Sequence, residues 1–88
     1  MTRPLIRKGD KTTHGGWVET CSLTSEVDGK GIARVEDIVI CPVKGHGGTT
    51  FIKTGDTSFM VDGKAAARND DETTCGALLI AAQTLTTD

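Results

Sequence analysis

The chain has 88 residues, of which 36% are hydrophobic and only three are aromatic, and its ten basic and twelve acidic residues leave a formal net charge of −2. This length allows one domain with a small core that buries only about 60–65% of the unfolded surface, so a staple such as a structural metal is expected. The interspersed charges form no basic stripe for nucleic acid, and no apolar run of about 18 residues could span a membrane. No apolar leader follows Met1, so we expect synthesis in the cytoplasm without a signal peptide.

A short frame occurs three times along the chain: Arg, two residues, Asp, three residues, and then a residue that can bind a soft metal. The copies consist of Arg7, Asp10 and His14; Arg34, Asp37 and Cys41; and Arg68, Asp71 and Cys75. The offsets between copies are 27 and 34 residues, so the frames extend over most of the chain. This pattern predicts a structural repeat built around a metal site, and the unequal offsets predict loops that differ between copies.

Short alternating segments punctuated by Gly and Asp predict β-structure throughout the chain. The expected strand segments are 17–22, 49–54, 57–61 and 78–85. The pairs Asp28-Gly29 and Asp62-Gly63 suit the type I′ turn of a tight hairpin, in which both central residues need a positive φ. Segment 65–68 has a helix-forming composition but is too short for a stable helix, and only 77–82 leaves a helix open.

The Arg and Asp of each frame favour a structural role. Asp accepts main-chain N–H groups in turns, and Arg pairs with carboxylates, so we expect a salt bridge or a turn cap in each copy. Catalysis by the three Asp residues would require two acids in one cleft with unequal environments. Copies arranged about a pseudo-threefold axis would instead hold the carboxylates apart.

The frames supply three of the four N or S ligands that a structural zinc site requires. His46 is the other histidine of the chain, and Pro42 and Gly45 predict a turn that brings it back towards Cys41. The predicted zinc ligands are His14, Cys41, His46 and Cys75. With four protein ligands no position remains for an activated water, so the metal is expected to be structural.

The alternatives for these residues fit the sequence less well. Histidines in turns are often only surface or hydrogen-bonded residues, and the spacing needed for a zinc deaminase or for a Cys-x-x-Cys redox pair is absent. The Gly-rich segment 44–48 lacks the Gly-Lys-Ser/Thr ending of a phosphate-binding loop. Three cysteines without a leader argue against a disulfide framework. Cys21 lies outside the frames, and we expect it to be a half-buried strand residue.

Several further motifs together resemble one family. The Arg residues end the tetrapeptides Pro4-Leu5-Ile6-Arg7, Gly31-Ile32-Ala33-Arg34 and Ala65-Ala66-Ala67-Arg68, and the ligand positions read His14-Gly15-Gly16, Cys41-Pro42 and Cys75-Gly76-Ala77. In these motifs the chain resembles the PAAR-repeat proteins, the metal-tipped cones of bacterial type VI secretion systems. Glu36 and Asp70 stand where the family has Gly, as at Gly9, which leaves the turn geometry there open.

The resemblance implies an all-β fold: a small cone of three short-strand repeats with pseudo-threefold symmetry and one structural Zn²⁺ near its vertex. It implies a single domain over 1–88, with repeat frames near 4–16, 31–48 and 65–77 and no effector extension. The implied function is to cap a trimeric spike of the valine-glycine repeat (VgrG) family, one chain per trimer, sharpening it for membrane puncture, linking effector cargo and leaving the cell through the secretion apparatus.

No enzymatic activity, nucleic-acid binding or stable membrane insertion is expected, and the isolated chain should be a monomer. The alternatives are a small zinc-stabilised adaptor and, against the acidic balance, a zinc-dependent nucleic-acid binder. An enzyme would need a further domain after Asp88, which we do not expect.

Overall fold

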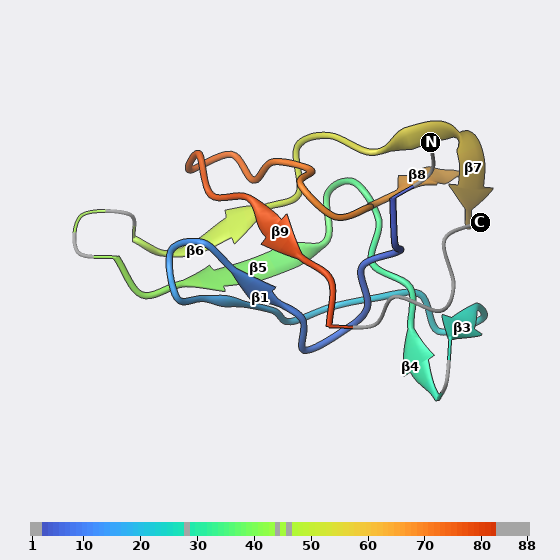
Figure 1. The fold of residues 1–88 in the computed structure, drawn as a ribbon, viewed down its shortest axis with the longest axis horizontal. Helices are drawn as coiled ribbons and strands as arrows, with labels where there is room; N and C mark the ends of the chain where they lie inside the picture. The colour runs from blue at the N-terminus through green and yellow to red at the C-terminus, as the bar shows by residue number, and fades with distance from the viewer. Residues whose placement is uncertain (1–2, 28, 44, 46, 83–88) are drawn as a thin grey trace.

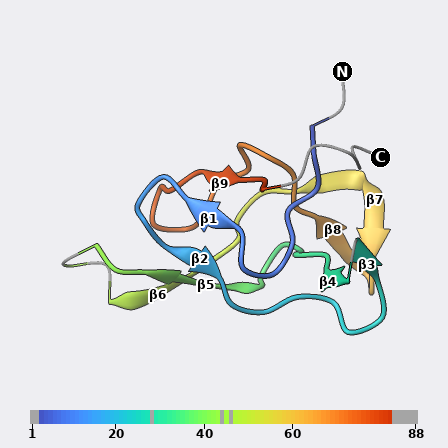
Figure 2. The same cartoon turned by 60° about the horizontal axis from the view of Figure 1, so that its bottom comes forward.

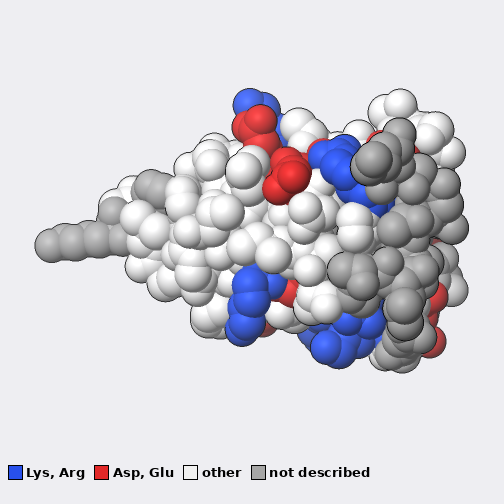
Figure 3. Space-filling model, in the orientation of Figure 1, with Lys and Arg blue, Asp and Glu red and all other residues white. Residues whose placement is uncertain are grey.

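The computed structural model describes residues 3–27, 29–43, 45 and 47–82, and these residues form nine short β-strands and no helix (Figure 1). Within this part of the chain no helix is long and apolar enough to cross a membrane. The molecule measures 34 × 23 × 23 Å along its principal axes and tapers towards one end (Figure 3). The prediction of a small all-β cone is confirmed.

Five strands form one sheet in the order β6-β5-β2-β1-β9, and two hairpins, β3–β4 and β7–β8, lie together at the wide end (Figure 1). The strands are β1 Lys11–Thr12, β2 Trp17–Val18, β3 Glu26–Val27, β4 Lys30–Gly31, β5 Ile38–Cys41, β6 Gly48–Phe51, β7 Asp56–Val61, β8 Lys64–Ala66 and β9 Leu79–Ile80. Strands this short leave most of the chain to turns, as the frequent Gly and Asp predict.

The five-stranded sheet curls into a wall that surrounds the core (Figure 2). Its edge strand β6 continues into the third repeat, because Ile52 bridges Thr73 and the Thr74 N–H donates to the Phe51 carbonyl at 2.8 Å. The other edge strand, β9, pairs with β1. Each repeat therefore contributes a hairpin or tight turn to a wall whose two edges both meet the third repeat, and this arrangement protects edges that would otherwise be unpaired.

The three Arg-x-x-Asp frames form the same turn. The Arg main-chain N–H donates to the Asp carboxylate at 2.9, 2.7 and 2.7 Å, and the Asp N–H donates back to the Arg carbonyl at 3.1, 3.0 and 3.0 Å. The residue before the Asp has a positive φ in every copy, 88° at Gly9, 78° at Glu36 and 73° at Asp70. The two residues that replace Gly therefore keep the turn and accept a strained backbone.

A closed ring of main-chain hydrogen bonds joins the segments that precede these turns. Ile6 donates to Ala67, Ala67 to Ala33, and Ala33 back to Ile6, each at 2.9 Å. A second cyclic set lies beside it, in which Lys8 donates to Gly31, Val35 to Ala65, and Asn69 to Pro4. These bonds relate the three tetrapeptide segments to one another, whereas threefold symmetry of the whole cone stays a prediction.

The core fills the inside of the wall around this ring. Its main cluster consists of buried residues from all three repeats: Ile6, Val18, Ala33, Val39, Ile52, Ala67 and Leu79. A second cluster contains Leu5, Ile32, Val61 and Ala66, with Val27 and Phe59 packed against it. Ala at three of these positions lets the three backbones approach closely enough to hydrogen-bond, which explains the small residues of the tetrapeptides.

Repeat two differs from the others at the narrow end. Strands β5 and β6 are joined by residues 42–47, whereas repeats one and three turn tightly at Gly15 and Gly76, with φ of 78° and 89°. The longer loop accounts for the offset of 34 residues against 27. The prediction of unequal loops is confirmed.

The other local predictions have mixed outcomes. Asp62 and Gly63 have φ of 54° and 80°, which confirms that turn; Gly29 has φ of 81°, and Asp28 lies outside the described residues. Segment 77–82 contains strand β9 and no helix, and 83–85 lie outside the described residues. The strand predicted over 17–22 ends at Val18, because the Thr20 side chain bonds to Asp37 and to the Ile38 N–H. Cys21 is half-buried as predicted, but its assignment to a strand was wrong.

Candidate metal centre

Three of the predicted ligands meet at the narrow end of the cone. His14 Nδ1 lies 3.7 Å from the Sγ of Cys41 and 3.7 Å from the Sγ of Cys75, and the two sulfurs lie 3.4 Å apart. Two ligands come from the tight turns of repeats one and three, and Cys41 ends strand β5. Positions 61 residues apart in the sequence therefore converge on one point, as the shared frame predicts.

Threonine hydroxyls hold the two tight turns in place. Thr12 Oγ1 accepts the N–H groups of His14 and Gly16 at 3.2 and 3.1 Å. In repeat three the equivalent Thr73 accepts the N–H of Ala77 at 3.1 Å and lies 3.2 Å from the Sγ of Cys75. These bonds satisfy the main-chain donors of each turn and fix the direction of the ligand side chain.

A residue of repeat two also holds the ligand turn of repeat three. Thr50, which faces inwards from β6, accepts the N–H of Cys75 at 3.1 Å and lies 2.6 Å from the Thr74 hydroxyl. Cys75 is thus held from two repeats. In the sequence, Thr12-Thr13 and Thr73-Thr74 are recognisable as residues in the same position of their frames, but no role was predicted for them.

The donor triangle fits a tetrahedral soft metal. Zinc–sulfur and zinc–nitrogen bonds of about 2.3 and 2.0–2.1 Å place tetrahedral donor atoms about 3.5–3.8 Å apart, close to the three distances here. The two sulfurs are too far apart for a disulfide, whose length is about 2.05 Å, and both cysteines are free. One imidazole and two thiols are the donors that zinc accepts.

The two thiols differ in acidity. Burial acts to raise the pKa of Cys75, but hydrogen bonds from Thr73, the Ala77 N–H, Cys41 and His14 outweigh it and lower the pKa to about 5. Burial raises the pKa of Cys41. Cys75 is therefore the more readily deprotonated thiol, and a bound cation would favour the thiolate at both positions.

The remaining predicted ligand and the cysteine outside the frames have different outcomes. His46 lies outside the described residues, so its place as the fourth ligand stays a prediction. Cys21 is not part of the metal-ligand group. It packs against Gly31, where any added Cβ would collide with its sulfur.

The Arg and Asp residues of the frames act in turns rather than in a cleft. All three Asp carboxylates are buried and cap the Arg N–H of their own turn. Among the described residues the ion pair within a frame occurs only in repeat two, between Arg34 and Asp37 at 3.0 Å. Arg68 pairs instead with Asp56 at 2.9 Å, and Arg7 donates to the Val27 carbonyl at 3.3 Å.

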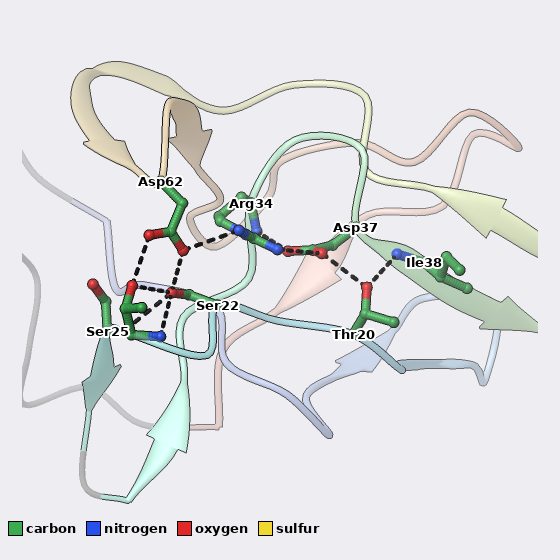
Figure 4. Close-up of polar contacts among 8 residues, drawn as sticks. Thr20, Ser22, Ser25, Arg34, Asp37, Ile38 and Asp62 are labelled. Atoms are coloured by element: carbon green, nitrogen blue, oxygen red, sulfur yellow. Dashed lines mark hydrogen bonds and ion pairs between the residues drawn. The ribbon is translucent and has the colours of Figure 1, made fainter.

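A chain of charged and hydroxyl groups connects the turn of repeat two to the wide end (Figure 4). Asp37 accepts from Thr20 at 2.8 Å and pairs with Arg34, which reaches Asp62 at 3.1 Å. Asp62 in turn accepts from Ser22 and Thr24, each at 2.6 Å. Burial acts to raise the pKa of Asp37, but the bonds from Arg34 and Thr20 outweigh it and lower the pKa.

A threonine hydroxyl donates a hydrogen bond to the frame Asp carboxylate of the next repeat, a contact here called the threonine clamp. Among the described residues it is present for two of the three Asp carboxylates. Thr54 donates to Asp71 at 2.8 Å as Thr20 does to Asp37. Both threonines follow a core residue by two positions, and at the corresponding place after Leu79 the chain has Ala81. Asp10 Oδ1 is buried and lacks a hydrogen-bond partner among the described residues. The threonine spacing was visible in the sequence, but its partner could be identified only from the fold.

One protein-family model matches most of the chain. The family model described as PAAR motif matches residues 8–81, which include His14, Cys41 and Cys75 and all but the first residue of the three frames. No curated protein matches the chain.

Proposed function

The chain belongs to the PAAR-motif family, and on this premise we propose that it forms the tip of a type VI secretion spike. In this proposal the wide end sits on the blunt end of a trimeric VgrG-type spike, one chain per trimer, and the narrow end leads. The chain leaves the cell with the apparatus and links effector cargo to the spike. The family is one of structural spike tips, so we propose no catalytic activity.

The ring of hydrogen bonds among Ile6, Ala33 and Ala67 carries this proposal. It brings three segments of one chain around a common point with the same main-chain bonds. A threefold partner presents three equal surfaces, and a single chain can match them only if it offers three similar backbones. The hairpins β3–β4 and β7–β8 lie at the wide end, where main-chain edges can extend the strands of a partner (Figure 1).

The metal is proposed to act as a structural staple at the other end. His14, Cys41 and Cys75 would hold Zn²⁺, and His46 would fill the fourth position. Bound zinc supplies cross-linking of three repeats and no open coordination site. The residues themselves contribute orientation, because hydrogen bonds of Thr12, Thr73 and Thr50 hold the two ligand turns.

The test is the stoichiometry of the complex with a truncated β-helical trimer of the cognate spike. Native mass spectrometry should give one chain per trimer. Lysine cross-linking should join the trimer to Lys30 and Lys64, in the wide-end hairpins, and not to Lys11 or Lys53 on the wall. Three chains per trimer would indicate side-on adaptor binding, and no complex at micromolar concentration would reject the proposal.

A further inference from the structure

The charged residues are distributed unevenly along the axis of the cone. Segments 12–18, 38–52 and 73–81 contain one Lys, Arg, Asp or Glu residue, Lys44, although the whole chain has ten basic and twelve acidic residues. These are the three segments that converge on the metal-ligand group. On the face shown in Figure 3, charged side chains lie over the middle and the wide end, and the described atoms of the narrow end are uncharged.

The change from charged to uncharged residues occurs between two successive rows of outward-facing residues. The row nearer the ligands, here called the belt, consists of Thr13, Trp17, Ile40, Phe51, Thr74 and Leu78. Neighbouring repeats meet along it, because Trp17 pairs with Ile40, and the N–H groups of Thr74 and Thr13 donate to Phe51 and Leu78. Within the hairpins Trp17, Phe51 and Leu78 lie opposite Lys11, Ile38 and Glu72 of the next row, so the two rows run obliquely to the strand pairing. The next row towards the wide end, here called the collar, consists of Lys11, Glu19, Ile38, Lys53, Glu72 and Ile80. The belt has no charge, whereas four of the six collar positions carry one.

Each repeat contributes a large apolar side chain at the same belt position. Trp17, Phe51 and Leu78 each precede a buried core residue of the wall, so their side chains point outwards. Trp17 is 38% exposed and Phe51 47% exposed, while Leu78 is half-buried. The core does not explain two exposed and one half-buried apolar side chain at this repeated position, because the neighbouring residues Val18, Ile52 and Leu79 already fill it.

Trp17 has the orientation of a residue at a boundary between apolar and aqueous media. Its indole N–H donates to Glu19 of the collar at 3.2 Å, and Lys11 Nζ lies 5.9 Å from the ring centroid. The polar edge of the indole thus reaches the charged row, and the ring body covers the uncharged row. Amphipathic aromatic side chains take this arrangement where one end is apolar and the other is hydrated.

We infer that the belt is a seat for the lipid–water interface and that the collar limits the depth of contact. This inference deepens the proposed function, on which its biological setting rests, by naming the surface that the narrow end meets. Contact would be reversible, because the belt is small and four of its six positions carry Thr or a partly buried side chain. A zwitterionic surface suits the belt, since an uncharged row gains nothing from anionic head groups and a collar with two basic and two acidic residues has no net attraction to them.

The experiment uses the fluorescence of Trp17, the single tryptophan of the chain, in the metal-loaded protein. Titration with phosphatidylcholine vesicles should shift its emission to the blue and reduce quenching by iodide, to the same extent at low and high salt. Phe51→Lys should weaken vesicle partitioning by about tenfold, because the belt then carries a charge that must stay hydrated. Met60→Lys, a matched change at a 54%-exposed position of β7 at the wide end, should partition as the unmodified protein does.

Several results would overturn the inference. These are no emission change with vesicles, equal losses in the two lysine variants, or binding only to anionic vesicles at low salt. A shift that depends on protein concentration without vesicles would show that the belt covers a second copy of the chain. None of these bears on the stoichiometry of the spike complex, so the proposed function can survive the loss of this inference.

Discussion

The narrow and wide halves of the cone are stabilised by different means. In the wide half, apolar side chains and a closed ring of main-chain hydrogen bonds hold the three repeats together. In the narrow half, beyond Val39 and Ala77, the buried side chains are chiefly Cys41 and three threonines, and the other two ligands, His14 and Cys75, are half-buried. A tapering end has too little volume for a hydrophobic core, and cross-linking by a metal can replace one.

Removal of the metal should have the largest effect, and it should destabilise the narrow half. Ligation contributes about 10–16 kcal/mol in small zinc modules, and even a loss of about 3 kcal/mol would lower the Tm of a domain of this size by about 12 °C or more. Chelation should therefore lower the Tm by at least that amount. Amide exchange should increase first at 12–16 and 73–77 and last at Ile6, Ala33 and Ala67. An unchanged Tm after complete removal would show that no metal staples the tip.

Breaking one turn of the wide half should have a smaller effect. Asp37→Asn removes the negative charge of the carboxylate that accepts hydrogen bonds from Arg34 and Thr20. We expect the free energy of unfolding, measured by urea denaturation, to fall by about 1–3 kcal/mol. Asp70→Asn is the matched control, because this exposed neighbour of a capping Asp should change stability little.

The same carboxylate predicts a pH dependence. The pKa of Asp37 is lowered in the folded state, so its charge contributes stability that is present above the unfolded pKa of about 4 and is lost as pH falls through the folded value. The unmodified protein should lose stability below about pH 4 more steeply than Asp37→Asn. Parallel curves for the two proteins would contradict the role given to this charge.

A third threonine clamp, on Asp10, should stabilise the wide half further. Ala81→Thr places a hydroxyl where Thr20 and Thr54 stand in the other repeats, and by analogy with those contacts we expect it to donate to Asp10 Oδ1, which has no hydrogen-bond partner in the described part of the chain. We expect a gain of about 0.5–1.5 kcal/mol in the free energy of unfolding. Ala81→Val has a similar shape without the hydroxyl and should give no gain; equal effects would remove the clamp as the cause.

Relieving the strained turns should have the smallest effect. Glu36→Gly restores the residue type of Gly9 at a φ of 78°, and the relief of about 1 kcal/mol is partly offset by the greater entropy of Gly in the unfolded chain. A net gain of about 0.5 kcal/mol is expected by thermal denaturation. Gly9→Ala should have the opposite sign, because its φ is 88° although no atom crowds the site.

Much of this architecture could be predicted because the repeat places equivalent residues in phase. The convergence of His14, Cys41 and Cys75 and the capping role of the frame Asp residues follow from that phase. The pairing of Arg68 with Asp56 does not, since it depends on where one repeat's hairpin meets another repeat's turn. The end of strand β2 before Thr20 was missed for a similar reason: a side-chain bond to Asp37 displaces the main-chain ladder.

The only sign of the belt in the sequence is that three segments contain almost no charged residues. Segments 12–18, 38–52 and 73–81 are far apart in the chain, and their common lack of charge has meaning only once the fold brings them to one end. The closed hydrogen-bond ring of Ile6, Ala33 and Ala67 is likewise invisible in a pattern of small residues. Both features arise from contacts between repeats, which spacing within a repeat cannot predict.

The metal content of the purified chain tests the central claim most directly. Elemental analysis should give one Zn²⁺ per chain for the unmodified protein and for Cys21→Ser, whose thiol is not part of the ligand group. The double variant His14→Ala, Cys75→Ser should lose the metal, because it removes two of the three donor atoms that meet at the narrow end. A metal-free unmodified protein, or full zinc retention in the double variant, would contradict the account.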